Sequence, residues 1–364
     1  MNKRLYVDIH VLQNVPPSCV NRDDTGSPKT AVYGGTTRAR VSSQAWKRAV
    51  RKQFVERMAE TEVGIRSQYI HDYVTKAIRQ YDASVDAEKL AKEVLEKVGI
   101  SPKKSKKKGP VPSLETEILI FFSLAQVDAL ARLALSGNAT QEDVNKALTE
   151  NPAIDMLLFG RMIAVKDVKI SLDIDAACQV AHAISTHTIH NEYDYFTAVD
   201  DHPDARTASA YLDTKEFNSS TLYRYATVCV SELAKTSTID VAQAVYDFTD
   251  AFLMSMPDGQ KNSYANGTMP DFAYITIRED QPVNLVGAFE QPVQSKDGGY
   301  LQKSVDALMN YAGRVYDSFA EVPLASWISG TMDVPESSAE KLHKNLLLKA
   351  LAAEVSRRLA DEVM

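Results

Sequence analysis

The sequence predicts an α+β fold in which a sheet domain is interrupted by a large helical insertion. Strand-like alternation of apolar and polar residues opens the chain and returns in its second half. A helical period dominates from about residue 60 to residue 168. Near residues 193–218 the pattern alternates at both ends around a polar, turn-rich middle, which is typical of a long hairpin. Because strands and helices are segregated along the chain, α+β is favoured over α/β.

The composition is that of an ordinary soluble protein. The chain has 364 residues, enough for about two structural units, and is 45% hydrophobic and 24% charged. No apolar run approaches the roughly 20 residues that span a bilayer, and the first residues do not resemble a secretory signal. Cys19, Cys178 and Cys229 lack CxxC spacing and indicate reduced thiols. We therefore expect a cytoplasmic protein without membrane contact.

The first elements are a strand, a loop and a strand followed by a helix. "RLYVDIHVLQ" (Arg4–Gln13) alternates, which places the apolar side chains from Leu5 to Val11 on one face. After a Pro- and Gly-punctuated loop, Arg38 and Arg40 alternate with apolar residues in a second short strand. Ser42 or Ser43 then caps a helix expected from about residue 44 to residue 60.

The middle and last parts of the chain differ in period. Residues 60–168 are expected to be helical nearly throughout, with one helix starting at Ser113 and another at "TQEDVNKALTEN". "KKSKKKG" from Lys103 is expected to be a solvated loop. "AACQVAHAISTHTI" fits a helix passing into a strand, and the hairpin tip falls near 200–205. A late strand, "DFAYITIRED", precedes amphipathic helices at about 301–319 and 337–363.

The sequence offers no catalytic, cofactor or metal site. Walker A, GxGxxG, GxSxG and HExxH motifs are absent. His182, His187 and His190 follow Cys178, but their spacing fits neither a helical ligand pair nor a zinc finger, so packing roles are expected. The acidic pair Asp200-Asp201 is typical of a turn.

A basic stretch stands out from an acidic chain. The formal net charge is −7, yet residues 25–55 contain no Asp or Glu. Solvated faces normally mix charge signs, and Lys47 and Arg51, four residues apart, project from one helix face. Cations and a helix N-terminus together suit the phosphates of single-stranded nucleic acid. A solvated helix face is the competing interpretation. The candidates from charge pattern are Lys29, Arg38, Arg40, Ser42, Ser43, Gln44, Lys47, Arg48 and Arg51.

Several motifs resemble a known family. "HVLQNVPPSCVNRDDTGSPKTAVYGGTTRARVSSQAWKRAVR", "FGRM", "AHAISTH", "DYFTAVDD", "TKEFNSSTLYRYA", "NSYA" and "AFEQPV" occur in the order found in the CasC family, the backbone subunits of type I-E CRISPR Cascade complexes. The resemblance implies an RRM- or ferredoxin-like palm, a helical fingers insertion and a β-hairpin thumb. The implied ranges are palm 1–59, fingers 60–175, palm 176–192, thumb 193–218, and palm with C-terminal helices 219–364.

The resemblance also implies RNA-contacting residues. In the palm they are Asn21, Arg22, Lys29, Ser42, Gln44, Lys47, Arg48 and Arg51. Met162 matches an apolar wedge near a displaced nucleotide, and Thr197 and Val199 match thumb positions.

The implied function is that of a non-catalytic backbone subunit in antiviral defence. It would polymerise along CRISPR RNA, kink it periodically and present it for pairing with target DNA. The expected partners are CRISPR RNA, target DNA through the guide, further copies in a helical filament and other Cascade subunits. Alternatives are a CRISPR RNA-processing endonuclease using His187 or His190, target cutting by a thumb acid at Asp200-Asp201, and a scaffold that binds no nucleic acid.

Overall fold

The computed structural model describes residues 4–105, 114–163, 172–198, 211–236, 239–335 and 337–361. The chain divides into two compact units. Unit 1 comprises Met1–Gln53, Gln179–Ser231 and Val241–Met364, and unit 2 comprises Phe54–Cys178 and Glu232–Asp240. A large sheet lies in unit 1 and most helices of unit 2 are consecutive, so the predicted α+β class is confirmed. Within the described ranges, no helix has the length and apolarity needed to cross a membrane.

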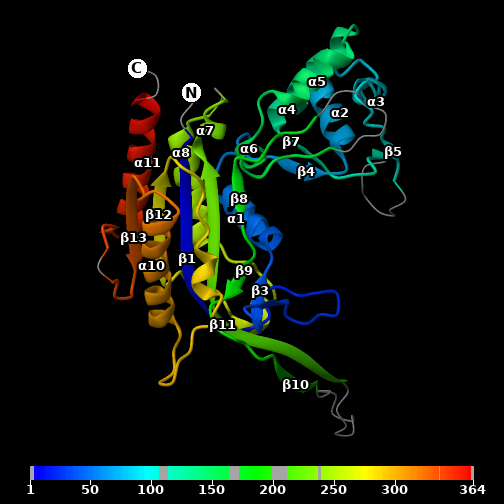
Figure 1. Cartoon of the computed structure of the whole chain (residues 1–364). Coiled ribbons are helices and arrows are strands. Elements are labelled where there is room, and N and C mark those ends of the chain that lie inside the picture. Colours follow the sequence, from blue (N-terminus) through cyan, green and yellow to red (C-terminus); the bar gives the residue numbers. More distant parts are fainter. Residues whose placement is uncertain are drawn as a thin grey trace. The chain divides into compact units, whose positions relative to one another are not determined.

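Unit 1 is built on one sheet whose centre is the first strand of the chain (Figure 1). Its strand order is β14-β13-β12-β1-β11-β9-β3-β2, with β8 and β10 also paired to β11. The strands are β1 Tyr6–Ser18, β2 Thr30–Tyr33, β3 Thr36–Val41, β8 Cys178–Val180, β9 Ala183–Ser185, β10 Glu192–Ala198, β11 Tyr211–Cys229, β12 Phe272–Arg278, β13 Ala325–Gly330 and β14 Glu340–Lys341. Strand β1 pairs antiparallel with both β11 and β12.

Both faces of β1 are buried, although its alternation predicts only one. Val7, Ile9 and Val11 are buried as expected, and so are Asp8 and His10 on the opposite face. Because Asp8 and His10 alternate with apolar residues, the sequence suggests that their face of β1 is exposed to solvent. Helices cover the sheet on both sides, however, so that this face is buried as well.

Two helical layers enclose the sheet of unit 1. On one side α10 (Leu301–Ser318) and the 3-10 helix η1 (Leu285–Phe289) pack against Tyr223 and Tyr225 of β11. The intervening Arg224 points to the other face, where it meets α1 (Ser43–Arg57) and α8 (Val241–Met254). The remaining helices of this part of the chain are α7 Val230–Leu233, α9 Lys261–Tyr264 and α11 Lys344–Asp361.

The predicted hairpin pairs as expected in its described part. Glu192 to Ala198 of β10 pair antiparallel with Phe217 to Tyr211 of β11. The predicted tip, with Asp200-Asp201, lies outside the described residues. The stretch 178–185 forms β8 and β9 and no helix, so the prediction of a helix passing into a strand is wrong in its helical part.

Unit 2 has its own hydrophobic core, formed mainly by α2, α3, α4 and α5. Its elements are β4 Ile65–Ser67, α2 Ile70–Tyr81, α3 Ala87–Glu96, β5 Lys103–Lys104, β6 Leu114–Glu115, β7 Ile120–Phe122, α4 Leu124–Ser136, α5 Gln141–Thr149 and α6 Ile154–Phe159. The prediction of helix nearly throughout is wrong at the four short strands. The helix expected from Ser113 begins only at Leu124, after a capping box formed by Ser123 and Gln126. Of the lysine run expected to be a loop, Lys103 and Lys104 form β5, where Lys103 pairs with Glu117, and its residues from 106 onwards lie outside the described residues.

Candidate nucleic-acid interface

Helix α1 is fixed to the sheet by a buried arginine. The Arg224 guanidinium of β11 lies 3.8 Å from the ring centre of Trp46 and 4.6 Å from that of Phe252. It donates to Gln13 Oε1 at 2.6 Å and to the carbonyl oxygen of Phe252. Burial lowers the pKa of Arg224 to about 9, so the group stays protonated near neutral pH. Trp46 therefore packs inward and sets the orientation of the α1 surface.

The N-terminus of α1 is tied to the loop that follows β1. The amide of Ser42 donates to Asn21 Oδ1 at 2.9 Å, and the Ser42 carbonyl accepts the amides of Ala45 and Trp46. Ser42 thus occupies the capping position, and Ser43 is the first helical residue. Asn21 is in turn held by its carbonyl, which accepts the Lys29 amide at 2.8 Å.

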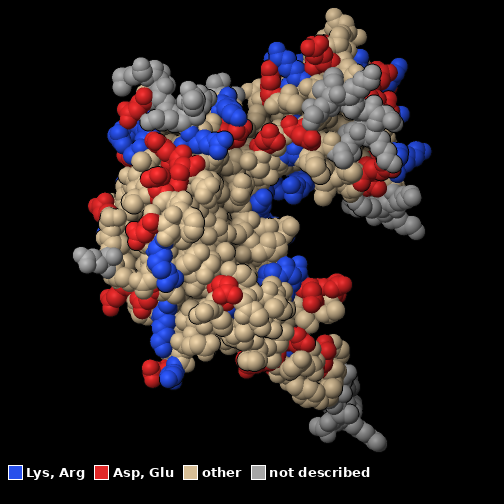
Figure 2. Space-filling view, viewed as in Figure 1, with Lys and Arg blue, Asp and Glu red and all other residues tan. Residues whose placement is uncertain are grey.

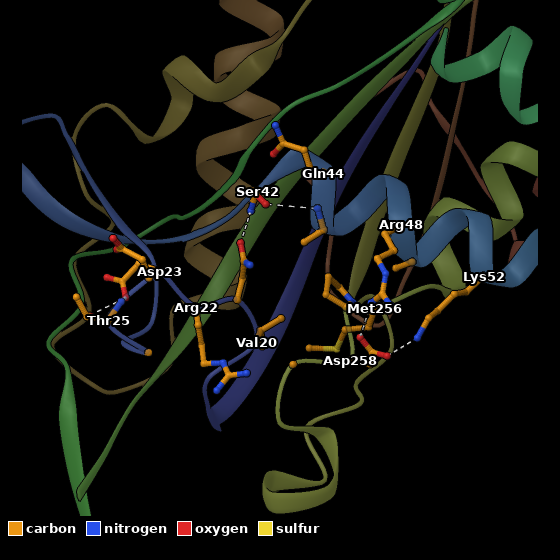
Figure 3. A pocket seen from close by; sticks show the side chains of 17 residues that line it. Val20, Arg22, Asp23, Thr25, Ser42, Gln44, Arg48, Lys52, Met256 and Asp258 are labelled. Carbon is orange, nitrogen blue, oxygen red and sulfur yellow. Dashed lines mark hydrogen bonds and ion pairs between the residues drawn. The ribbon is translucent and has the colours of Figure 1, made fainter. Parts of the chain in front are cut away.

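A surface pocket of about 710 Å³ opens where this loop, the start of α1 and the segment 256–259 meet (Figure 3). Five of the RNA-contacting residues expected from the sequence line it. They are Asn21, Arg22, Ser42, Gln44 and Arg48. Apolar side chains, among them Val20 and Met256, contribute to the same wall. The structure therefore brings these predicted residues together in space.

The loop beside the pocket is shaped by Asp23. Its Oδ1 accepts the amides of Thr25 at 2.9 Å and Ser27 at 3.1 Å, closing an Asx-type turn. The hydrogen bond from the Thr25 side chain holds the pKa of Asp23 below its usual range. Asp23 thus organises the loop through backbone contacts.

Asp258 contributes an acid that the sequence did not point to. Its carboxylate pairs with Lys52 and lies 3.5 Å from the Arg48 guanidinium. The hydrogen bond from Lys52 lowers the pKa of Asp258, with the charges of Lys52 and Arg48 acting in the same direction. Lys52 is therefore part of this arrangement, together with the predicted Arg48.

The other predicted cations lie nearby along the chain. Lys47 and Arg51 are half-buried one helical turn apart on α1. Arg40 donates to the Thr30 carbonyl at 2.9 Å and lies 3.3 Å from His182. Burial, with the charges of Arg40 and Lys29, lowers the pKa of His182, which keeps that ring neutral near neutral pH.

Arg38 corrects one sequence expectation. It is fully buried and does not project from β3 towards a ligand. Its guanidinium donates to the backbone carbonyls of Ser185 and Phe289, both at 2.9 Å, and its Nε donates to Thr36. Burial lowers the pKa of Arg38. Alternation on a short strand suggested an exposed side chain, but the segment near Phe289 covers this position, and Arg38 ties it to the sheet.

Two of the remaining predicted residues lie on other elements. Met162 belongs to unit 2 and is 83% exposed. Thr197 is exposed on β10, opposite Leu212. Val199 lies outside the described residues.

The histidines proposed for catalysis have different surroundings. The ring of His187 stacks on Tyr300 with centroids 3.7 Å apart. Its Nε2 accepts the Thr221 amide at 3.1 Å, so Nδ1 carries the proton and donates to the Thr188 carbonyl at 2.9 Å. Both nitrogens of His187 are therefore engaged within the protein. His190 is exposed.

The described residues contain no group of three or more His, Cys, Asp or Glu side chains placed to hold a metal ion.

The visible surface of unit 2 mixes charge signs. In Figure 2 Lys and Arg alternate with Asp and Glu over the helices of unit 2. Ion pairs one helical turn apart account for part of this mixture, among them Lys89–Glu93, Lys92–Glu96 and Arg132–Asp128. The start of α1 differs, since its first turn has no acidic residue and its partner acid comes from segment 256–259.

Comparisons with known proteins find similar chains along nearly the whole length of the sequence. A family model described as CT1975-like protein matches residues 7–354. A solved chain described as "CRISPR RNA-guided surveillance complex, pre-nicking" is 31% identical with a TM-score of 0.82, covering 96% of this chain and all of that one. Another, described as "CRISPR RNA-guided surveillance complex", is 28% identical with a TM-score of 0.62, covering 96% and 99%. No curated protein sequence matches the chain.

Proposed function

Because this chain belongs to the CT1975-like protein family, we propose that it is a subunit of a CRISPR RNA-guided surveillance complex and forms the RNA-binding backbone of that complex. The observation that best supports this proposal is the end-to-end similarity to a chain described as part of such a complex, at 31% identity and with full coverage of that chain. The more specific assignment is a type I-E CasC-like subunit of the cytoplasm. It polymerises along CRISPR RNA without cutting it, kinks it and presents it to target DNA.

The polar and basic side chains at the start of α1 support the proposal that the protein contacts the RNA backbone. A protein that holds guides of any sequence must bind phosphates and sugars and leave the base edges open. Gln44 and Arg48 line the pocket at the start of α1, and Lys47 and Arg51 lie on the same helix. These cations are presented by a helix whose docking is fixed through Trp46. The arrangement therefore suits a single-stranded phosphate chain.

The first experiment identifies the ligand. The full chain is co-expressed with a CRISPR array and the other subunits of its complex, and the RNA that co-purifies is sequenced. We expect guide-containing CRISPR RNA to be enriched. Purified protein free of nucleic acid would contradict the proposal. Specific cleavage of repeat RNA that is lost in His187→Ala or His190→Ala would replace it with a processing nuclease.

The second experiment tests the α1 cations. Lys47→Ala with Arg51→Ala removes two positive charges, so RNA affinity should fall roughly tenfold near 100 mM salt. The slope of log K against log salt should flatten by about 1.4, since each phosphate contact to a single strand contributes about 0.7. The measurement is fluorescence anisotropy of labelled RNA at several salt concentrations.

A matched control removes two charges from unit 2. Lys89→Ala with Lys92→Ala takes away exposed lysines that pair with Glu93 and Glu96. We expect this variant to bind RNA as the wild type does. Equal losses in both double variants would show that only total charge matters.

A further inference from the structure

The acid opposite the α1 cations comes from a distant part of the chain. Asp258 pairs with Lys52, which lies 206 residues away in sequence, and with Arg48 at 3.5 Å. Figure 3 shows Asp258 beneath the helix, with its carboxylate directed at Lys52. Arg48 and Asp258 both line the pocket in which the predicted RNA contacts meet.

The backbone holds Asp258 close to this pocket. A Cβ on the following residue, Gly259, would lie 2.0 Å from the carbonyl oxygen of Val20, so the segment packs directly on the loop after β1. The side chain of Asn266 donates to the Gly259 carbonyl at 3.3 Å. The amide of Lys261 donates to the Asp258 carbonyl, also at 3.3 Å. The carboxylate is therefore presented from a supported turn at a fixed place.

Stability does not account for this arrangement. The side chains of Arg48, Lys52 and Asp258 are 70%, 48% and 50% exposed. Exposed ion pairs contribute little to folding, because water screens the attraction and ordering long side chains costs entropy. The same carboxylate disfavours a phosphate that enters the pocket, because it repels the phosphate and already pairs with Arg48 and Lys52.

Resting on the proposed function, we propose that Asp258 is a specificity-determining residue of the RNA interface and that its carboxylate competes with RNA phosphates for Arg48 and Lys52. Binding a phosphate requires Asp258 to give up or share these cations. A single subunit therefore holds an arbitrary RNA weakly. Copies bound side by side on one RNA restore the affinity, because each further contact is made at high effective concentration.

The test is Asp258→Asn, which keeps the side-chain size and removes the charge. The probe is short labelled oligouridine, bound by the purified full chain. At about 50 mM salt, affinity should rise roughly three- to tenfold, and the salt slope should steepen by about 0.7, as for one additional phosphate contact. The gain should shrink as salt rises, because the screening length falls below about 10 Å above 0.1 M. The urea midpoint of unfolding should not change.

Two further variants separate competition from a general charge effect. In the Arg48→Ala, Lys52→Ala background, Asp258→Asn should give a smaller gain, because the cations that it would release are gone. Asp361→Asn removes an acid of similar exposure, 53%, which pairs with Arg357 on α11. That control should leave oligouridine affinity unchanged.

The outcomes distinguish this inference from the proposed function. If Asp258→Asn binds as the wild type does while Lys47→Ala with Arg51→Ala binds more weakly, the competition is refuted and the backbone function stands. An equal gain from Asp361→Asn also refutes it. If neither the wild type nor any variant binds RNA, both proposals fall.

Discussion

Asp8 and His10 lie on the same face of β1, opposite its apolar residues, where tyrosines pack around them. The His10 ring stacks on Tyr225 and Tyr274, with centroids 5.1 and 5.6 Å away, and its Nδ1 lies 2.9 Å from the Tyr223 hydroxyl. Asp8 accepts the Tyr225 hydroxyl and the amide of Val283, both at 2.8 Å. Burial lowers the pKa of His10 to about 3 and raises that of Asp8 to about 6.

These shifts act on stability with opposite signs. Between pH 6.5 and 3 the unfolded chain protonates His10 and the folded chain does not, so acidification lowers the free energy of unfolding. Between pH 6 and 4 the folded chain protonates Asp8 first, so acidification raises that free energy. The pKa shift of His10 is larger than that of Asp8. As the pH falls from 6.5, the stabilisation that comes from neutral His10 therefore begins to be lost before Asp8 begins to compensate.

Replacing His10 by Phe isolates the histidine contribution. The His10→Phe variant keeps a ring between the tyrosines and removes Nε2, which has no hydrogen-bond partner in the fold. From pH 6.5 to 5 its free energy of unfolding should fall by about 2 kcal/mol less than that of the wild type. Urea unfolding at the two pH values measures the difference. Parallel losses in both proteins would contradict the assignment.

At the level of single residues, the sequence predicts which side chains are suited to bind a phosphate better than it predicts which other residues surround them. The acid-free stretch 25–55 identified Arg48 and Gln44, which do line the pocket. It gave no indication of Asp258, because that partner is brought in only by the fold. The prediction that Arg38 is exposed was wrong for the same reason, because the segment that buries Arg38 lies some 250 residues later in the chain.

At the level of elements, the docking of α1 depends on one aromatic side chain. Trp46 is buried against Arg224 and belongs to a core cluster with Val15 and Leu222. Trp46→Ala should lower the free energy of unfolding by about 3–5 kcal/mol, because it leaves a cavity and exposes one face of a buried guanidinium. The measurement is urea unfolding followed by circular dichroism, since only two tryptophans report by fluorescence.

An exposed aromatic provides the comparison for Trp46. Phe319 is 91% exposed at the end of α10, so Phe319→Ala should unfold at the wild-type urea concentration. If Trp46→Ala proves as stable as Phe319→Ala, the packing role assigned to Trp46 is wrong.

Helices and strands were predicted correctly where the hydrophobic pattern continued over many residues. They were predicted wrongly where pairing with a distant strand determined the structure. The 3.6-residue period gave α1 and α10 to within a few residues, and alternation gave β1. The run "ILIFF" fits a helix or a strand equally well, and Ile120–Phe122 became β7 because it pairs with Ile65–Ser67. Two- and three-residue strands of this kind depend on distant partners, which local sequence does not specify.

At the level of the whole molecule, the proposed function predicts assembly that depends on RNA length. Native mass spectrometry of the chain with single-stranded RNAs of increasing length should show one additional subunit per fixed increment of RNA. Heterologous contacts between copies allow such open growth along the strand. A complex whose subunit number stays constant as the RNA lengthens would contradict filament formation.

The central place of β1 also governs how the protein is made. Tyr6 pairs with Cys229 on one side and with Arg278 on the other, so the first strand has no complete set of neighbours until β12 has been synthesised. At about 5–20 residues per second, the ribosome takes roughly 15–50 s to cover that distance. During this time an apolar strand waits with one or both edges unpaired, a state prone to aggregation. Production of this protein should therefore depend on chaperones that shield the nascent N-terminus.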